Sequence, residues 1–278
     1  MRAAVVGHVE WVEFARVERV PAAGEIAHAT ENWEDVGGGG SVAAVQLAKL
    51  AGSCDFLTAL GDDDLGARSR ERLEAMGVRV HARVAPRTRR ALTLLEPGGE
   101  RTITTLGEKL IPRGADPLPW ESLIGVHALY FVVGDVPALQ AARRARVLVA
   151  TPRDLGTLVE AGVELDALVG SGTDPGERYA AGAISPQPRL VARTAGVAGG
   201  EFVAADGRTG RWDSAPLPDP IADAYGAGDS FAAGLTFALA EGTSTEDALA
   251  FAARCGAACM TGDGPYEGQL ARASLGGD

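Results

Sequence analysis

The chain has 278 residues, of which 46% are hydrophobic and 23% are charged, and its formal net charge is −11. This length and composition are typical of one large globular domain, or of a main domain with a small appendage, and they exclude general disorder. The acidic balance excludes a broad basic face, so nucleic acid is not an expected partner.

The first half of the chain alternates between core elements and strand-rich segments. Apolar runs predict buried strands, and a period of three to four residues predicts helices. Segment 10–36 instead shows alternating residues broken by Pro21 and Gly24, which favours half-exposed strands. The core elements expected in this half are strands at 3–7 and 54–60 and helices at 40–50 and 62–77.

A second strand-rich segment follows at 78–106, where Pro97, Gly98 and Gly99 form the expected turn of a hairpin. From residue 128 onward, strands and helices alternate, which favours a parallel sheet covered by helices on both faces. We therefore expect a single domain over residues 1–278. Its two strand-rich segments, 10–36 and 78–106, are expected to pair with each other as a small lid over the site.

The strongest chemical signal is DAYGAGDSFAAGLTFALAEG, from Asp223 to Gly242. Its small residues Gly226, Ala227 and Gly228 lead directly into a helix. A glycine-rich turn at a helix N-terminus exposes unpaired N–H groups, and the helix dipole adds positive potential there. Such a turn suits the charge that develops on a phosphoryl group during transfer.

Asp229 lies in the first turn of the same helix and has two interpretations. It can be an ordinary N-terminal charge or capping group. It can also be the general base that activates an attacking hydroxyl, because phosphoryl transfer needs such a base close to the donors that hold the phosphate.

DAYGAGDSFAAGL resembles the D-T-x-G-A-G-D-x-F-x-x-G signature of the ribokinase-like carbohydrate kinases, the phosphofructokinase-B family. The resemblance continues along nearly the whole chain in the order of that family. The further matching segments are VGGGGSVAAVQLAKLAG, TALGDDDLGARSRERLEAMGV, RALTLLEPGGERTITTLG, DALVGSGTD and RTAGVAGG. The resemblance implies an α/β fold, a three-layer αβα domain with a mainly parallel central sheet and a small β-sheet lid.

The resemblance also implies roles for single residues at the acceptor side. Asp229 would be the base, and Gly226, Ala227, Gly228 and the Asp229 amide would form the anion hole. Gly38 and Gly39 would approach the substrate with bare backbone. Asp223 would lie near the substrate or near a monovalent cation such as K⁺.

On the nucleotide side, the resemblance places Thr194, Gly196 and Gly199 along ATP. Ser171 and Asp174 would belong to a network of water around Mg²⁺, with Asp174 acting through water. Mg²⁺ is expected because nucleotide phosphates need a cation that bridges and neutralises them.

Three departures from the family pattern indicate an atypical subgroup. Val12 replaces an aspartate that grips sugar hydroxyls in many members, and Val42 replaces an asparagine of the Gly-Gly motif. Strand alternation points Glu10 to the same face as Val12, so Glu10 is a candidate replacement, or else a solvated lid residue. The third departure is S-x-x-D, from Ser171 to Asp174, in place of N-x-x-E.

Three further side chains have both a functional and an ordinary interpretation. His8 follows the first strand and either faces the pocket or is a hydrogen-bonded core residue. Arg101 and Arg153 either meet an acidic substrate or are solvated or structural arginines.

The function expected from these residues is an ATP-dependent kinase that phosphorylates a hydroxyl of a sugar, a sugar acid or a nucleoside. The alternative is a nucleotide- or metabolite-binding sensor on the same fold, without kinase activity. Exposed lid strands predict a homodimer formed through the lid. The sequence contains no signal peptide and no membrane span, so the expected location is the cytoplasm.

Overall fold

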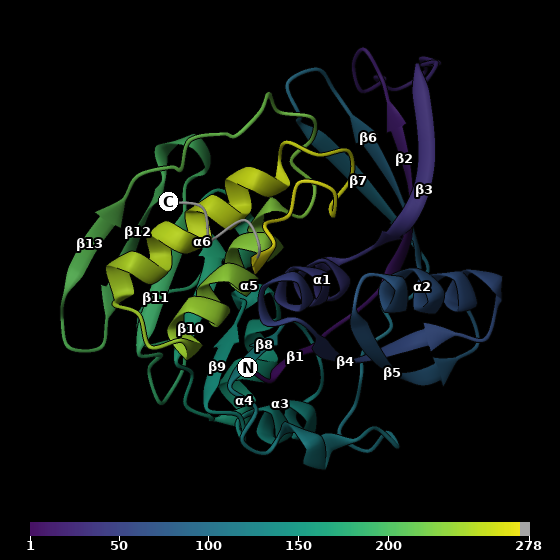
Figure 1. Ribbon diagram of the computed structural model, residues 1–278. Coiled ribbons are helices and arrows are strands. Elements are labelled where there is room, and N and C mark those ends of the chain that lie inside the picture. The colour runs from purple at the N-terminus through teal and green to yellow at the C-terminus, as the bar shows by residue number, and fades with distance from the viewer. Residues whose placement is uncertain (273–278) are drawn as a thin grey trace.

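The computed structural model describes residues 1–272, which form two sheets of different size (Figure 1). The strands of the larger sheet are β1 (Ala3–Val6), β4 (Cys54–Gly61), β5 (Val78–Ala85), β8 (Ala128–Phe131), β9 (Val147–Ala150), β10 (Ala167–Ser171), β11 (Leu190–Thr194), β12 (Gly200–Ala204) and β13 (Thr209–Trp212). The strands of the smaller sheet are β2 (Glu10–Arg16), β3 (Glu31–Gly37), β6 (Arg90–Leu95) and β7 (Arg101–Leu106).

The larger sheet has nine strands in the order β13-β12-β11-β10-β9-β8-β1-β4-β5. All neighbours from β11 to β5 pair in parallel, whereas β12 and β13 pair antiparallel at one edge. Helices cover both faces of the parallel part, which explains why its strands are short apolar runs. The carboxyl ends of these strands meet along one edge of the sheet, where ligands of such folds bind.

Helices form the two outer layers and complete the three-layer arrangement expected from the sequence. One face carries α1 (Gly39–Ala51), α2 (Asp64–Ala75), α5 (Ala227–Ala240) and α6 (Thr245–Cys259), and the other carries α3 (Val136–Ala142) and α4 (Leu155–Ala161). Short 3₁₀ turns are η1 (Trp120–Leu123), η2 (Pro152–Asp154), η3 (Pro175–Glu177) and η4 (Gly196–Ala198). Within residues 1–272, none of the helices has the length and hydropathy needed to cross a membrane.

The helices differ in how their first turns are capped. The side chains of Asp63, Asp135 and Ser244 accept hydrogen bonds from the first turns of α2, α3 and α6. Helices α1 and α5 instead begin after Gly38 and Gly226, which provide no side-chain cap. α4 also lacks a side-chain cap. α1 and α5 pack against each other, and Gly39 at the start of α1 lies against the Asp229 carboxylate in the first turn of α5, so these two N-termini lie close together.

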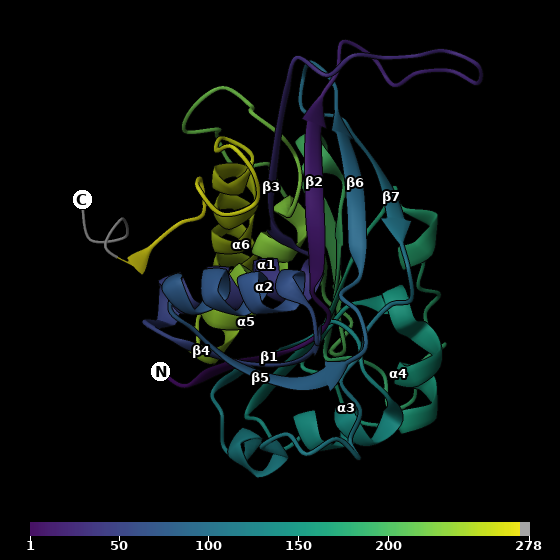
Figure 2. The same cartoon turned by 90° about the vertical axis from the view of Figure 1, so that its right-hand side faces the viewer.

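The smaller sheet is the lid, and its strand order is β3-β2-β6-β7. β2 pairs in parallel with β6, so the two strand-rich segments of the sequence do share one sheet. Figure 2 shows this sheet standing out from the edge of the larger one. β6 and β7 form the expected hairpin, closed by the hydrogen bond from Glu96 N to Glu100 O.

The lid differs from the sequence expectation in its boundaries. Residues 78–85 alternate as a strand should, but they form β5, which pairs in parallel with β4 at the edge of the larger sheet. The second lid segment therefore begins at Arg90. In the first segment, residues 17–30 form no strand, and β3 begins only at Glu31.

The apolar face of the lid packs on the loop that precedes α5. The Phe14 ring stacks on Trp33 at a centroid distance of 5.2 Å and meets Tyr225 edge-on at 5.1 Å. The turn of the β6–β7 hairpin reaches the same loop, where Ala224 N donates to Gly99 O at 3.2 Å. The lid and the signature segment thus hold each other in place.

Candidate active site

The signature segment forms the predicted glycine turn at the N-terminus of α5. Gly226 has a φ of 81°, and a Cβ placed on it would lie 2.8 Å from Cγ1 of Val42. Both the left-handed backbone and the close approach of α1 therefore require glycine here. Val42, which departs from the family pattern, is a fully buried packing residue at this contact.

The first turn of α5 leaves donors open. Ala227 N donates weakly to Ala224 O at 3.4 Å, but the N–H groups of Gly228 and Asp229 meet no acceptor in the part of the chain that the structure describes. A Cβ on Gly228 would meet nothing within 4 Å, so this turn faces open space. Open N–H groups at a helix N-terminus make an anion-binding position.

The carboxylate of Asp229 lies directly against the Gly-Gly segment. A Cβ placed on Gly39 would be 2.6 Å from Oδ1 of Asp229, so only glycine leaves room for the carboxylate. Among residues 1–272, no group donates a hydrogen bond to this carboxylate. Its oxygens are therefore available to accept a proton from a ligand.

The surroundings of Asp229 raise its pKa to about 6. Burial is the main cause, because it disfavours the charged form, and the nearby Glu177 carboxylate adds to the rise. Arg153, Arg101 and Lys109 oppose it in that order. A carboxyl group with this pKa is largely ionised at neutral pH, yet it is a stronger base than an ordinary aspartate.

Gly38 and Tyr225 connect the Gly-Gly segment to the signature. Gly38 has a φ of 92°, and its N–H donates to the Tyr225 hydroxyl at 2.9 Å. A Cβ on Gly38 would lie 3.2 Å from the backbone nitrogen of Glu10 and from Cδ2 of His8. The structure thus brings Gly38, Gly39, Glu10 and Asp229 together, as expected for an acceptor site.

Glu10 is a buried member of this site. Its carboxylate pairs with Nη1 of Arg89 at 2.9 Å, and burial raises its pKa although Arg89 and Lys109 oppose the rise. Val12 is fully buried, and a Cβ on Gly37 would meet its Cγ2 at 2.5 Å. Val12 therefore fills the core beneath the Gly-Gly segment. Glu10 is the carboxylate that remains at the site.

The segment after β10 gathers two carboxylates around one guanidinium. Arg153 Nη2 lies 2.6 Å from Oδ2 of Asp174 and 2.5 Å from Oε1 of Glu177. Glu177 Oε2 also accepts from Ser171 N at 2.7 Å, and Ser171 Oγ accepts from Asp174 N at 3.2 Å. The predicted residues Ser171 and Asp174 therefore lie in one network, with Arg153 in a structural pairing.

Glu177 was missed by sequence reasoning, although its carboxylate is the one that acts most strongly on Asp229. Its position, six residues after Ser171 in a turn rich in Pro and Gly, gave no functional signal. The structure joins it to Asp229 because β10 and α5 meet at the same end of the sheet.

The predicted nucleotide turn has an open glycine and a packed one. Thr194 ends β11, and Gly196 has a φ of 56° with nothing within 4 Å of an added Cβ. Gly199 has a φ of 77°, and a Cβ there would collide with the carbonyl oxygen of Trp212. Gly196 thus offers bare backbone to a ligand, whereas Gly199 is required by packing. Val197 lies between them with 87% of its surface exposed.

Asp223 is completely buried, and its carboxylate accepts hydrogen bonds from backbone N–H groups instead of facing a cavity. Its Oδ1 accepts from Tyr225 N at 2.8 Å, and its Oδ2 accepts from Gly264 N at 2.9 Å. Burial raises its pKa, and these two backbone hydrogen bonds oppose the rise. Asp223 therefore ties the signature loop to the loop after α6.

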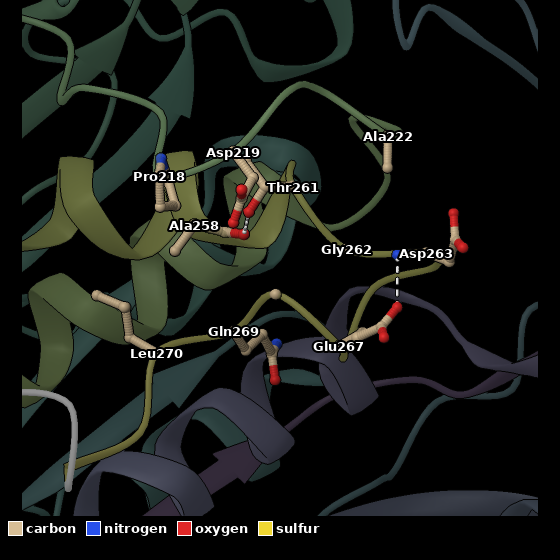
Figure 3. A pocket seen from close by; sticks show the side chains of 11 residues that line it. Pro218, Asp219, Ala222, Ala258, Thr261, Gly262, Asp263, Glu267, Gln269 and Leu270 are labelled. Carbon is tan, nitrogen blue, oxygen red and sulfur yellow. Dashed lines mark hydrogen bonds between the residues drawn. The ribbon is translucent and has the colours of Figure 1, made fainter.

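A hollow of about 500 Å³ lies outside that loop (Figure 3). Its lining includes Ala258, Thr261, Asp263 and Glu267, and Figure 3 shows Thr261 bonded to Ala258 and the Asp263 amide bonded to Glu267. Neither Asp229 nor the Gly-Gly segment lines it. The hollow is thus separate from the candidate site.

The carboxylates near β10 fit a loosely held magnesium ion. Within the described residues, no three His, Cys, Asp or Glu side chains gather into a protein-only metal site. Mg²⁺ commonly keeps several waters and binds proteins through one or two carboxylates together with substrate phosphates. Asp174 and Glu177 are carboxylates of this kind, but both already pair with Arg153, so they would act on the ion through water.

Comparison with known proteins agrees with this geometry. The sequence matches the pfkB family carbohydrate kinase profile over residues 2–117 and 162–271. An ATP-dependent ribose-1-phosphate kinase of Halopiger xanaduensis is 27% identical over 288 residues, covering 92% of this chain and 91% of that protein.

Solved structures show the same fold. A ribokinase of Thermotoga maritima superposes with a TM-score of 0.79 at 22% identity, covering 99% of this chain and 98% of the other. An Arabidopsis thaliana ribokinase complexed with ribose and ATP gives a TM-score of 0.77 at 22% identity, covering 99% and 97%. With most of its length matched by the family profile, the chain belongs to the pfkB family of carbohydrate kinases.

Proposed function

We propose that this protein transfers the γ-phosphoryl group of ATP to a hydroxyl of a small carbohydrate-like acceptor, with Asp229 as the general base. The observation that carries the proposal is the pairing of two features within one helical turn. The Asp229 carboxylate accepts no hydrogen bond from the described residues, and the open N–H groups of Gly228 and Asp229 lie beside it. A base next to an anion site is what phosphoryl transfer requires.

The reaction follows from this arrangement. The acceptor hydroxyl passes its proton to Asp229 while its oxygen forms a bond to the γ-phosphorus. The bond between the γ-phosphorus and the oxygen that bridges it to the β-phosphate breaks, and ADP leaves with that electron pair. The products are ADP and a phosphate ester, and the proton on Asp229 passes to solvent.

Other residues of the chain bind and position the reactants. The first turn of α5 supports the charge on the transferring group, and the uncapped first turn of α1 adds a second helix terminus nearby. Thr194 and the bare backbone at Gly196 would lie along the nucleotide. Mg²⁺ held through water by Asp174 and Glu177 would supply neutralisation of the nucleotide phosphates.

The acceptor belongs to the class of sugars, sugar acids and nucleosides or their close derivatives. The Halopiger relative is named for ribose 1-phosphate, and the Arabidopsis structure holds ribose and ATP. These names support a pentose-like acceptor. A monovalent cation such as K⁺ remains a prediction for the loop that Asp223 holds.

The proposal is tested by ADP release from Mg-ATP against sugars, sugar phosphates, sugar acids and nucleosides, with and without K⁺. Asp229→Asn should lower kcat at least about 100-fold, because general base catalysis contributes about 10²–10⁴-fold. Turnover within a few-fold of wild type in that variant would show that Asp229 is not the base. Nucleotide binding with no acceptor-dependent turnover across the panel would favour a sensor instead.

A further inference from the structure

A second group of charged side chains adjoins the proposed base and has no part in the step described above. Its centre is the ion pair between Glu10, at the start of β2, and Arg89, just before β6. The two side chains lie 2.9 Å apart and expose only 7% and 13% of their surface. The ion pair is therefore part of the wall between the lid and the larger sheet.

The ion pair lies beside the acceptor floor. The backbone nitrogen of Glu10 is 3.2 Å from the position of a Cβ on Gly38, and Gly39, the next residue, touches Asp229. His8 Nε2 is 3.8 Å from the Glu10 carboxylate, and His8 Nδ1 is buried without a partner among the described residues. The cluster thus contains polar atoms that no protein group satisfies.

Lys109 adds a cation to this cluster. Its neighbour Leu110 packs against Ala59 and Ala85 at the ends of β4 and β5, which fixes this part of the chain beside the site. Lys109 is half-buried, and within residues 1–272 its ammonium group has no carboxylate at ion-pair distance and makes no hydrogen bond. It is close enough to lower the pKa of Glu10 and of Asp229.

The cluster contains a cation that has no close partner. Burial lowers the pKa of His8 well below its usual value, and Lys109 and Arg89 lower it further, so His8 is neutral. The carboxylates of Glu10, Asp229 and Asp154 act on Lys109 from a distance, but none of them lies at ion-pair distance from its ammonium group, and Nε of Arg89 is buried without a partner among the described residues. Because charges removed from water are normally paired, the unpartnered ammonium group of Lys109 indicates an anionic ligand.

The other unpaired cation near the base needs no such ligand. Arg101 lies on the exposed strand β7, where solvent stabilises its charge. Arg153 is already paired with two carboxylates. Lys109 is therefore the cation that lacks a partner, and Arg89, although paired with Glu10, keeps a buried Nε without one among the described residues.

We propose that Arg89 and Lys109 bind a phosphate group carried by the acceptor, so that the preferred acceptor is a phosphorylated sugar rather than a free sugar. A guanidinium fork beside an ammonium group suits a phosphate dianion. Val12 and Val42 are fully buried packing residues and add no polar group to the site. The inference rests on the proposed function, because only that function makes the bound ligand the acceptor of the phosphoryl group.

The test compares a pentose monophosphate, the corresponding free pentose and the corresponding pentonic acid as acceptors for the wild-type enzyme and for Lys109→Met. We expect the monophosphate to have the highest kcat/KM. Lys109→Met should raise its KM by about 10- to 100-fold, because a charge-assisted contact is lost. Because Lys109 also lowers the pKa of Asp229, kcat is compared well above that pKa, where Asp229 is ionised in both enzymes and kcat should change little. The KM of the free pentose should not change.

Arg90→Met is the matched control, because Arg90 is the next residue after Arg89 but is exposed and pairs with Glu13 at 3.7 Å. Its KM for the monophosphate should equal that of wild type. Equal kcat/KM for the monophosphate and the free pentose, or an unchanged KM in Lys109→Met, would overturn the assignment. A preference for the pentonic acid would overturn the choice of phosphate.

Binding without turnover separates this inference from the proposed function. Calorimetric titration of the monophosphate into Asp229→Asn, without ATP, should show binding that Lys109→Met weakens in the same background. If no acceptor is phosphorylated by wild type but this binding pattern holds, the kinase proposal fails and the phosphate subsite stands. If a free pentose is phosphorylated and Lys109→Met has no effect, the kinase proposal stands and the subsite fails.

Arg89 gives an independent check that allows for a folding defect. Arg89→Met alone leaves the Glu10 carboxylate buried without its partner and is expected to destabilise the protein. The double variant Glu10→Gln with Arg89→Met removes both charges and should fold. It should still lose affinity for the monophosphate, and wild-type affinity in the folded double variant would contradict the role of Arg89.

Discussion

The pKa of Asp229 is set by burial and by charged neighbours that act in opposite directions. Burial and the Glu177 carboxylate raise its pKa, whereas Arg153, Arg101 and Lys109 restrain the rise, and the result is a value of about 6. A base with a pKa near the working pH combines ionisation with proton affinity. Glu177 thus influences the chemistry without touching the transferred group.

The pH dependence of catalysis tests this balance. A base works in its ionised form, so kcat/KM should rise with pH through about 6 and level off above it. In Glu177→Gln the negative neighbour is gone, the pKa of Asp229 falls, and the inflection should move to lower pH. The measurement is a pH–rate profile of both enzymes, with the exposed Glu160→Gln on α4 as control. An inflection at the same pH in Glu177→Gln and wild type would show that Glu177 does not raise the pKa of Asp229.

The residues predicted from the sequence are those that lie in continuous motifs. Gly226 to Asp229 form one turn, so their proximity is built into the chain. Glu177 lies 52 residues before Asp229 in the sequence (229 − 177), and Arg89 lies 79 residues after its partner Glu10 (89 − 10). Both placements follow from the order of strands in the sheets, which local patterns do not contain.

At the scale of elements, the β6–β7 hairpin is held to the signature loop by its turn. A Cβ on Gly99 would lie 2.5 Å from Cγ2 of Ile221, and Ala224 N donates to Gly99 O. Gly98, with a φ of 94°, has the same left-handed requirement but no neighbour within 4 Å of an added Cβ. Substitutions at these two glycines therefore distinguish the effect of backbone strain from the effect of displacing the lid.

Gly99→Ala should impair the enzyme more than Gly98→Ala. Both substitutions carry the backbone cost of alanine at positive φ, about 1–2 kcal/mol, but only Gly99→Ala pushes the hairpin away from the loop. We expect kcat/KM to fall at least about tenfold in Gly99→Ala, because misplacement by about 1 Å can cost 10²-fold. ATP hydrolysis without acceptor should rise as the lid admits water. Equal losses in the two variants would indicate strain alone.

β5 shows where sequence patterns stop being sufficient at this scale. The alternation from Val78 to Val84 correctly predicts a strand, but alternation is shared by lid strands and by the edge of a larger sheet. What assigns β5 is its pairing with β4 over eight residues, a contact between separate segments. The type of element is local information, whereas the sheet it joins is not.

At the scale of the whole molecule, the lid has an unprotected edge. All six residues of β7 are exposed, with Ile103 at 43% and Leu106 at 46%, and no strand covers its outer side in the described chain. Open strand edges favour pairing with another chain. This supports the expected homodimer through the lid.

Light scattering tests the dimer directly. Wild type should show twice the chain mass of 28.6 kDa, and Ile103→Lys should shift the mass toward that of one chain. Val159→Lys, at an exposed apolar position on α4 away from the lid, is the control and should leave the mass unchanged. A wild-type mass of one chain, or a dimer that Ile103→Lys does not affect, would contradict assembly through β7.

The order of motifs along the chain was enough to predict the three layers and the lid, because each layer needs its own sequence period. The open end of α5 was predicted from its glycine turn, whereas the side-chain caps of α2, α3 and α6 were not predicted. Asp63, Asp135 and Ser244 complete three helices with their own side chains, and Gly38 and Gly226 leave two unfinished.

Those two unfinished helices make the ligand a structural component. Substrate phosphates would accept hydrogen bonds from those backbone N–H groups in the first turns of these helices that have no acceptor in the described chain. Occupancy and conformational stability are then thermodynamically linked, since a ligand that binds only the native state stabilises it by RT ln(1 + [L]/Kd). A ligand that accepts from these amides is therefore expected to raise the free energy of unfolding of the protein.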